Sequence, residues 1–315
     1  MSESMTAEQL RARVAEGGVL RDLCLADGDF RGVALRHARL EQVDARNACF
    51  NDADLEACTW VDCQLAGSHF SRSQLRQVDF RNCQFDGANL ATATLDGGRW
   101  LRCEAVGLNL NEASVSNLSF IDCAFSVPNL RGSIMRQCQL DHVSLCDADA
   151  SSAQWQQVRV TDSLLRNLYL IDAHLEQCAF DRSSLTDVDL SYAETRALSL
   201  FQCQGARVRF IATNLIQAIF TDARLNAADF TDSGLVQANL NGAVLPGAQF
   251  LRARLRYAQC IYLRACGADF TDADLFGANL HAAELDNCQW KGARLDDIRP
   301  TDPLRLAADR WQPTL

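Results

Sequence analysis

Residues 268–280, ADFTDADLFGANL, carry the pattern that decides the fold. Phe270, Leu275 and Leu280 stand five residues apart, and an alanine precedes each of them by two positions. An amphipathic helix needs apolar residues at spacings of three and four, and a half-buried strand needs simple alternation. A fixed spacing of five fits neither template. The stretch therefore predicts a chain that turns a corner in every five residues.

The same spacing extends without interruption from Leu20 to Leu295, which gives 56 central positions. The site two residues before each centre holds mostly small or apolar residues, and neither set contains a charged residue although 22% of the chain is charged. Both sets are therefore expected to face the interior. All but seven centres are Leu, Phe, Trp, Met or Val, and the exceptions are Ala45, Ala105, Ala150, Thr195, Gly205, Cys260 and Ala265.

The pattern A-(D/N)-L-x-x resembles that of the pentapeptide-repeat family from about Leu20 to Leu295. The resemblance implies an all-β fold: a right-handed quadrilateral β-helix with four pentapeptides in each coil, and thus about 14 coils. Residues i and i+20 should then stack, and three columns of like residues agree with this. They are Phe210, Phe230, Phe250, Phe270 and Trp290; Leu35, Leu55, Leu75 and Leu95; and Cys63, Cys83, Cys103 and Cys123.

The two ends of the chain lie outside the repeat and divide it into three parts. Residues 1–19 are predicted to form an N-terminal capping helix, because Thr6 and Gln9 fit a capping box. Residues 20–295 form the β-helix, and residues 296–315 a C-terminal capping helix and tail. Thr301-Asp302-Pro303 opens this second helix, which should run to about Trp311. Each helix is expected to cover one end of the stack.

Four interior or near-interior positions break the regular pattern. Pro128 occupies a minus-two site, which is the position two residues before a centre, and Pro246 directly follows a centre. Each proline removes one backbone donor. Thr195 and Gly205 replace large apolar side chains at centres. Local irregularities are expected at all four.

Composition excludes several classes of function. The formal net charge of −10 argues against direct binding of nucleic acid and against a polybasic membrane-binding surface. No apolar run approaches the roughly 20 residues that span a bilayer, and residues 1–18 lack the basic and apolar regions of a signal peptide. The sequence thus predicts a cytoplasmic protein without a membrane span.

No catalytic, cofactor-binding or metal-binding site is predicted. Nine of the 14 cysteines fall on the minus-two site, where they should act as small buried hydrophobes. The five histidines should all face outward from different columns, so they form neither a catalytic dyad nor a metal cluster. Phosphate-binding, nucleophile-elbow and zinc-protease motifs are missing from the sequence. The chain is therefore not expected to be an enzyme.

Outward apolar residues in the later coils are the candidate functional surface. Stacked exposed side chains could form a patch for a protein partner or for a second copy of the chain. The residues are Ile211, Ile216, Ile219, Val236, Leu251, Tyr257, Tyr262 and Phe276.

These observations predict a non-catalytic protein-binding scaffold or adaptor. The opening TAEQLRARVAEGGVLRDLCLADGDFRG resembles accessory pentapeptide-repeat proteins encoded beside type VI secretion genes. This resemblance implies a role in effector loading or delivery, with a secretion effector or spike component as the partner. The alternative is a DNA mimic that binds DNA gyrase or topoisomerase IV, as quinolone-resistance members of the family do. Basic residues interrupt the acidic columns that begin at Asp22 and Asp52, which favours an ordinary solvated surface over a mimic.

Overall fold

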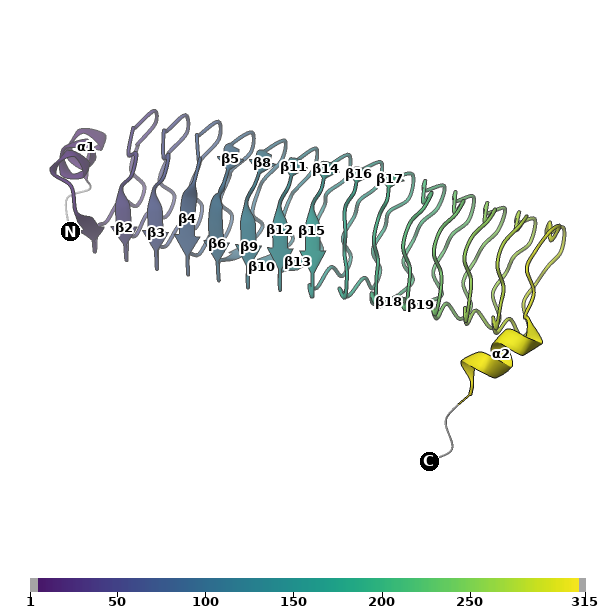
Figure 1. Cartoon of the computed structure of the whole chain (residues 1–315). Coiled ribbons are helices and arrows are strands. Elements are labelled where there is room, and N and C mark those ends of the chain that lie inside the picture. The colour runs from purple at the N-terminus through teal and green to yellow at the C-terminus, as the bar shows by residue number, and fades with distance from the viewer. Residues whose placement is uncertain (1–4, 312–315) are drawn as a thin grey trace. The chain divides into compact units, whose positions relative to one another are not determined.

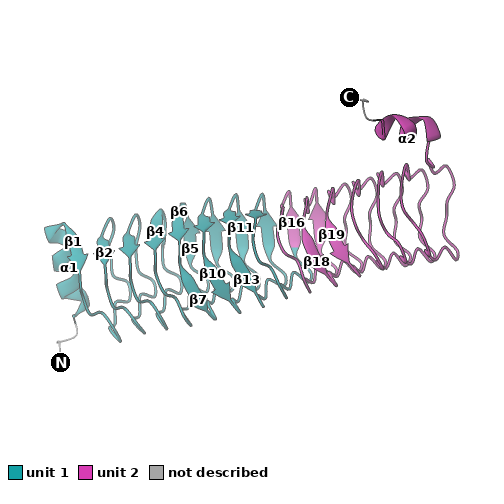
Figure 2. Cartoon of the chain, turned by 90° about the horizontal axis from the view of Figure 1, so that it is seen from below, with its two compact units in different colours: residues 1–173 teal, residues 174–315 magenta. Residues whose placement is uncertain are grey.

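The structure is a computed structural model that describes residues 5–311. The chain forms two compact units, residues 1–173 and residues 174–315 (Figure 2). Parallel strands that repeat along the chain build both units (Figure 1). Unit 1 contains α1 (Ala7–Glu16), β1 (Val19–Arg21), β2 (Arg39–Glu41), β3 (Thr59–Val61), β4 (Val78–Arg81), β5 (Thr94–Asp96), β6 (Gly98–Leu101), β7 (Glu104–Val106), β8 (Ser114–Ser116), β9 (Ser119–Ile121), β10 (Ala124–Ser126), β11 (Ile134–Arg136), β12 (Gln139–Asp141), β13 (Ser144–Cys146), β14 (Gln154–Gln156) and β15 (Arg159–Thr161). Unit 2 contains β16 (His174–Glu176), β17 (Glu194–Arg196), β18 (Gln204–Ala206), β19 (Arg224–Asn226) and α2 (Pro303–Asp309).

Unit 1 is a four-sided parallel solenoid. Its largest sheet runs β1-β2-β3-β4-β6-β9-β12-β15, and each strand pairs with the equivalent strand of the next coil, as in Leu20 with Leu40. The second wall contains β7-β10-β13, and the third contains β5, β8, β11 and β14. The fourth wall is a ladder of single bridges from Asp29 to Tyr169. Four ladders that pair position i with position i+20 confirm the predicted all-β solenoid.

Unit 2 repeats this arrangement with fewer extended strands. β16 pairs with β17 and β18 with β19, again in parallel and in the same register, as in Leu175 with Thr195. Single bridges continue four ladders, which begin at Ala179, Ser184, Asp189 and Glu194. The ladder from Ala179 reaches Arg299, so successive coils of unit 2 are paired along this wall.

Each corner of a coil is made by the second residue after a centre, called the corner residue below. Corner residues that are not glycine have φ between 51° and 62°, which is the left-handed region that such residues rarely adopt. The corner N–H donates to a carbonyl of the next coil, as from Asn47 to Ala66 at 2.8 Å. Asp, Asn and Gln are frequent at these corners, in keeping with the tolerance of Asp and Asn for this region.

The predicted interior columns are confirmed in both units. In unit 2, Phe210, Phe230, Phe250 and Phe270 stack with ring centroids 4.8 Å apart and interplanar angles of 7° or less. The leucine column from Leu35 and the cysteine column from Cys63 are buried in unit 1. Stacked rings add to simple burial of apolar area, so each interior column holds successive coils together.

Neither proline disturbs the ladders, contrary to the expectation from sequence. Pro246 lies directly after a centre. At the equivalent positions of other pentapeptides the N–H makes no backbone hydrogen bond between coils, so the proline removes no such bond. Pro128 loses only a bond within its own coil, and its carbonyl still accepts from Asp149 at 3.1 Å. The repeat therefore accommodates proline at positions that have no inter-coil donor.

Gly205 is explained by a close approach of the backbone. A β-carbon built at this centre would lie 2.9 Å from the carbonyl carbon of Leu185 and from the nitrogen of Thr186 in the preceding coil. A side chain at this position would thus force the two coils apart. The missing interior side chain is compensated by closer contact between backbones.

The two terminal helices differ in what they cover. Thr6 and Gln9 form the predicted capping box, and Leu10 on α1 is fully buried. Helix α2 also begins as predicted, with Asp302 accepting from Leu304 N and Arg305 N, but it ends at Asp309 and buries none of its residues. In the last coil Leu295 is 39% exposed. The expectation that α2 covers the interior of this coil is therefore wrong.

No helix among residues 5–311 is long and apolar enough to cross a membrane.

The stacked phenylalanines make a direct test of the interior. Replacing Phe230 by alanine should lower the free energy of unfolding by about 3–5 kcal/mol, because a cavity opens between Phe210 and Phe250. Chemical denaturation followed by circular dichroism measures this loss. Phe201→Ala is the matched control, because Phe201 lies on the outside and is only half-buried. Equal losses in both variants would contradict the assignment of Phe230 to the interior.

Candidate protein-binding face

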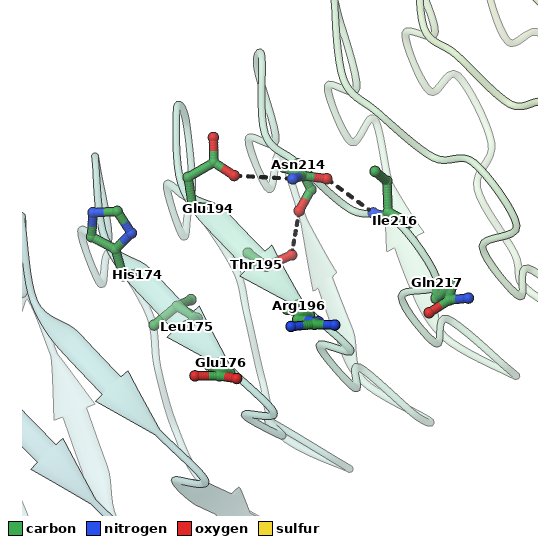
Figure 3. Close-up of a pocket in the computed structure, with 9 residues that line it drawn as sticks. All are labelled: His174, Leu175, Glu176, Glu194, Thr195, Arg196, Asn214, Ile216 and Gln217. Carbon is green, nitrogen blue, oxygen red and sulfur yellow. Dashed lines mark hydrogen bonds between the residues drawn. The ribbon is translucent and has the colours of Figure 1, made fainter.

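One wall of unit 2 carries a surface hollow, and we call this wall the Asn214 face. It is the wall whose ladder passes through Glu194, Asn214, Gly234, Arg254 and Asp274. A pocket of about 580 Å³ lies on this wall (Figure 3). Its lining is formed by His174, Leu175, Glu176, Glu194, Thr195, Arg196, Asn214, Ile216 and Gln217.

A hydrogen-bond chain orders the floor and rim of the pocket. The Asn214 side chain donates to Glu194 Oε2 at 3.0 Å, and its oxygen accepts from Ile216 N at 3.4 Å (Figure 3). Thr195, which stands at a centre, donates its hydroxyl to the Asn214 carbonyl. Contacts from its own coil and from the preceding coil thus fix the position of Asn214. The sequence irregularity at Thr195 coincides with this pocket.

A second hollow of about 280 Å³ continues the first along the same face. The two share Glu194, Asn214 and Ile216. The second also reaches Gly234, where a β-carbon would meet no atom closer than 3.9 Å. The missing side chain at Gly234 leaves open space beside Val236, so the hollows together form a groove.

The groove presents apolar, amide and charged side chains together with two hydroxyls. Neither lining contains a serine, cysteine or lysine. Its hydroxyls belong to Thr195 and Thr213, and both donate to backbone carbonyls, Thr213 to that of Leu190 at 2.7 Å. The remaining side chains are apolar, amide or charged, apart from the imidazole of His174. Both threonine hydroxyls are therefore engaged with the backbone, and neither lining offers a thiol or an amine.

The eight predicted surface residues are spread over three walls of unit 2. Ile216, Val236, Tyr257 and Phe276 follow the ladder of the Asn214 face, whereas Ile211 and Leu251 follow the ladder through Arg209. Ile219 belongs to the ladder through Asn239, and Tyr262 is the corner residue that follows this ladder. Ile216, Ile219, Tyr257 and Tyr262 are exposed, and the other four are half-buried. Only Ile216 and Val236 line the groove.

Phe276 is covered by its neighbours. The guanidinium carbons of Arg256 and Arg294 lie 5.1 and 4.7 Å from its ring centroid, and Tyr257 packs against it edge-on at 5.6 Å. Cation–π contacts of this kind stabilise the two arginines on the surface. Phe276 therefore offers little free apolar area to a partner, which its outward position in the sequence could not show.

Arginine–carboxylate pairs connect successive coils at the corners. Arg252 binds both oxygens of Asp232 at 2.7 Å, and Arg72 binds both oxygens of Asp52 at 2.8 Å. These hydrogen bonds hold the pKa of each carboxyl below its ordinary value. In the column that begins at Asp52, Arg72 and Arg252 thus pair with acids of the preceding coil and reduce the negative charge of the surface.

Helix α2 is held against the side of unit 2 by a buried histidine. His281 is only 2% exposed, so the prediction that all five histidines face outward is wrong for this one. Its Nδ1 accepts from Asp302 N at 3.2 Å, and its Nε2 lies 3.3 Å from Asp309 Oδ2. Tyr262 donates to the same carboxylate oxygen at 2.6 Å. Tyr262 thus anchors α2.

Nine of the 14 cysteines are buried and behave as interior packing. All 14 lie within the described residues and are free thiols there. Burial raises the pKa of Cys58, Cys203 and Cys260 to about 12, so these thiols stay protonated near neutral pH. Cys288, one of the nine at the minus-two site, is only half-buried because the last coil is open.

One group within residues 5–311 has the composition of a metal site: Asp141, His142 and Asp162 of unit 1. The sequence prediction of no metal cluster considered histidines with one another and missed carboxylates near them. His142 and Asp162 are equivalent positions of successive coils in one corner column, and this spacing was the signal that could have found them.

With four parallel ladders and a corner every five residues, the structure defines a parallel β-solenoid. The sequence matches the profile of the pentapeptide repeat region over residues 33–110 and 173–250, and that of pentapeptide repeats in eight copies over residues 233–272. These ranges span more than half of the chain. The chain belongs to the pentapeptide-repeat family.

Solved structures of the same fold are similar to this chain at low identity. HetL, a pentapeptide repeat protein involved in heterocyst differentiation regulation from the cyanobacterium Nostoc sp. strain PCC 7120, is 21% identical, with 93% of this chain and 96% of HetL covered and a TM-score of 0.25. Full-length QnrB1, a plasmid-mediated fluoroquinolone resistance protein, is 16% identical, with 92% and 97% covered and a TM-score of 0.21. A comparison with curated protein sequences gave no match. Likenesses this weak do not indicate what the chain binds.

The anchor of α2 can be tested through Tyr262. Its hydrogen bond to the Asp309 carboxylate raises the Tyr262 pKa, and the same bond lowers the Asp309 pKa. Asp309→Asn should therefore lower the Tyr262 pKa towards its ordinary value of about 10, as measured by ultraviolet titration. Tyr262→Phe is the control that identifies this transition among the four tyrosines.

The signs of these shifts define the pH range in which α2 is held. The stabilising contribution of Asp309 is present above its unfolded pKa of about 4 and is lost as pH falls through the lowered folded value. That of Tyr262 is present below about 10 and is lost as pH rises through the raised folded value. A Tyr262 transition that stayed in place in Asp309→Asn would contradict the anchor.

Proposed function

We propose that this protein is a non-catalytic protein-binding scaffold and that the groove on the Asn214 face receives its partner. The observation that carries the proposal is the pocket of about 580 Å³ on a wall that otherwise repeats regularly. Ile216, which is 45% exposed, stands at the junction of the two hollows. A side chain of the partner can bind in this groove and pack against Ile216, the exposed apolar residue at its centre.

The surroundings of Ile216 resemble the arrangement of a protein interface. Interfaces combine an apolar centre with a polar rim that excludes water and supplies hydrogen bonds. Around Ile216 the rim consists of Glu194, Arg196, Asn214 and Gln217, and Asn214 is already fixed by its own hydrogen bonds. A partner would thus meet a rim that needs little ordering on binding, which favours affinity.

A charge placed in the groove should abolish partner binding without harm to the fold. Ile216→Glu should weaken capture of the partner at least about tenfold, because burying an unpaired carboxylate costs several kcal/mol. Val106→Glu is the matched control, because Val106 is also an exposed β-branched residue directly after a centre, but in unit 1. Co-purification with proteins encoded by neighbouring genes measures the effect, and thermal unfolding checks both variants. Equal capture by both variants would contradict the proposal.

The more specific role that we propose is that of an adaptor in type VI secretion, which assists effector loading or delivery. Its support is the likeness of the opening residues 6–32 to accessory pentapeptide-repeat proteins of that system. Such an adaptor acts before export, so we also propose a cytoplasmic location. Co-expression with an effector and a spike component encoded nearby should give a stable complex, and failure of both to bind would remove this role and leave the scaffold.

The alternative is a DNA mimic that binds gyrase or topoisomerase IV, which the net charge of −10 favours. The inter-coil pairs Asp52–Arg72, Asp187–Arg207 and Asp232–Arg252 weigh against it, because they neutralise carboxylates that a mimic would present. We therefore expect no inhibition of supercoiling by purified gyrase, even at a large molar excess of this protein. Inhibition that Arg72→Gln and Arg252→Gln strengthened would reverse the order of the two proposals.

A further inference from the structure

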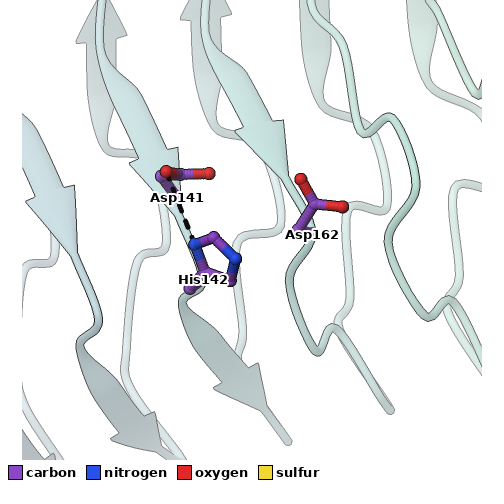
Figure 4. A group of neighbouring side chains, drawn as sticks. All are labelled: Asp141, His142 and Asp162. Carbon is purple, nitrogen blue, oxygen red and sulfur yellow. Dashed lines mark ion pairs between the residues drawn. The ribbon is translucent and has the colours of Figure 1, made fainter.

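Asp141, His142 and Asp162 meet on the outer surface of unit 1 (Figure 4). Each offers one ligand atom, and the three atoms lie within 4.8 Å of one another. Asp141 Oδ2 is 3.4 Å from His142 Nδ1. Asp141 is half-buried, and the other two side chains are exposed, so the group is open to ions in solution.

The solenoid itself fixes this arrangement. β12 and β15 pair in parallel, which places Asp141 beside Thr161 and so His142 beside Asp162 in the next coil. His142 and Asp162 are both corner residues, with φ of 51° and 52°. His142 N also donates to Thr161 O at 3.1 Å. Both side chains therefore leave the backbone in the same direction from rigid, equivalent positions.

Thr161 orients the Asp141 carboxylate. Its hydroxyl donates to Asp141 Oδ1 at 2.7 Å, and the other oxygen, Oδ2, is the one nearest His142. Hydrogen bonds from neighbouring residues orient metal ligands in this way, and their loss weakens metal binding. The Thr161 contact thus turns one carboxylate oxygen towards the imidazole.

The Asp141–His142 separation fits a single small cation, and the ligand atom of Asp162 lies within 4.8 Å of those of the other two residues. Zinc-like ions hold nitrogen and oxygen ligands at about 2.0–2.2 Å, which places neighbouring tetrahedral ligands roughly 3.4 Å apart. The Asp141–His142 separation is 3.4 Å, so one ion can bind both atoms without moving them. Imidazole favours transition metals over magnesium or calcium. Two carboxylates also balance the charge of a divalent ion.

We propose that Asp141, His142 and Asp162 form a binding site for one divalent first-row transition-metal ion of the zinc type. The ion joins two successive coils of unit 1, and solvent water completes its coordination. This site is separate from the groove of unit 2 and does not depend on the proposed function.

Titration of the full-length protein with Co²⁺ tests the site, because the visible spectrum of Co²⁺ distinguishes nitrogen and oxygen ligands from thiolates. We expect one Co²⁺ per chain with no thiolate charge-transfer band. His142→Gln and Asp162→Asn should each weaken binding at least about tenfold, and Thr161→Val about tenfold. Gln137 and Asn167 already occupy corners with positive φ, so both ligand substitutions suit the backbone.

Asp62→Asn is the matched control. Asp62 lies in the same corner column, but it stacks with Asn82, which donates a hydrogen bond to it at 2.9 Å, and not with a histidine. The affinity of this variant for Co²⁺ should equal that of the unchanged protein. Three results would overturn the proposal: no binding at millimolar Co²⁺, equal affinity in the His142 and Asp162 variants, or a thiolate band from one of the exposed cysteines.

Discussion

Backbone hydrogen bonds between successive coils are the constraint on which this structure depends. Within each unit they tie successive coils together, and they require every coil to have the same length. The 56 centres, which are nearly all apolar, and the small residues two positions before them keep this coil length constant, because both sets pack in the interior. The left-handed corners also keep the coil length constant, because each one turns the chain at the same position. The strain at each corner is offset because the corner N–H bonds to the next coil.

Most of the fold could be predicted from the sequence because interior positions are defined by spacing alone. The stacked rings from Phe210 to Phe270 and the buried column from Cys63 follow from a register of five and twenty. The ends could not be predicted in the same way. Asp302 and Pro303 indicate where α2 begins, but its packing depends on His281 and Asp309, which are distant in sequence and meet only through tertiary contacts.

The candidate sites were harder to predict because they depend on side-chain direction. The groove lies where Thr195 and Gly234 break the pattern, and sequence marked only the first of these as irregular. Ile216 is exposed, as expected of a binding residue. Phe276 is instead enclosed by Arg256 and Arg294, and the positions of these arginines in the sequence do not show that they contact its ring. Likewise, the group around His142 combines a corner column with the residue before it, and only the structure shows how close the side chains come.

The first and last coils differ in how well their interiors are covered. Helix α1 seals the first coil of unit 1 through Leu10, whereas the interior of the final coil of unit 2 reaches solvent at Leu295. A stack held by nearest neighbours loses structure most easily from an end with only one neighbour. We therefore expect unravelling to start at the carboxyl-terminal coil and to proceed one coil at a time towards the stacked rings of Phe270 and Phe250. The local stability of the coils of unit 2 should thus increase with their distance from that end.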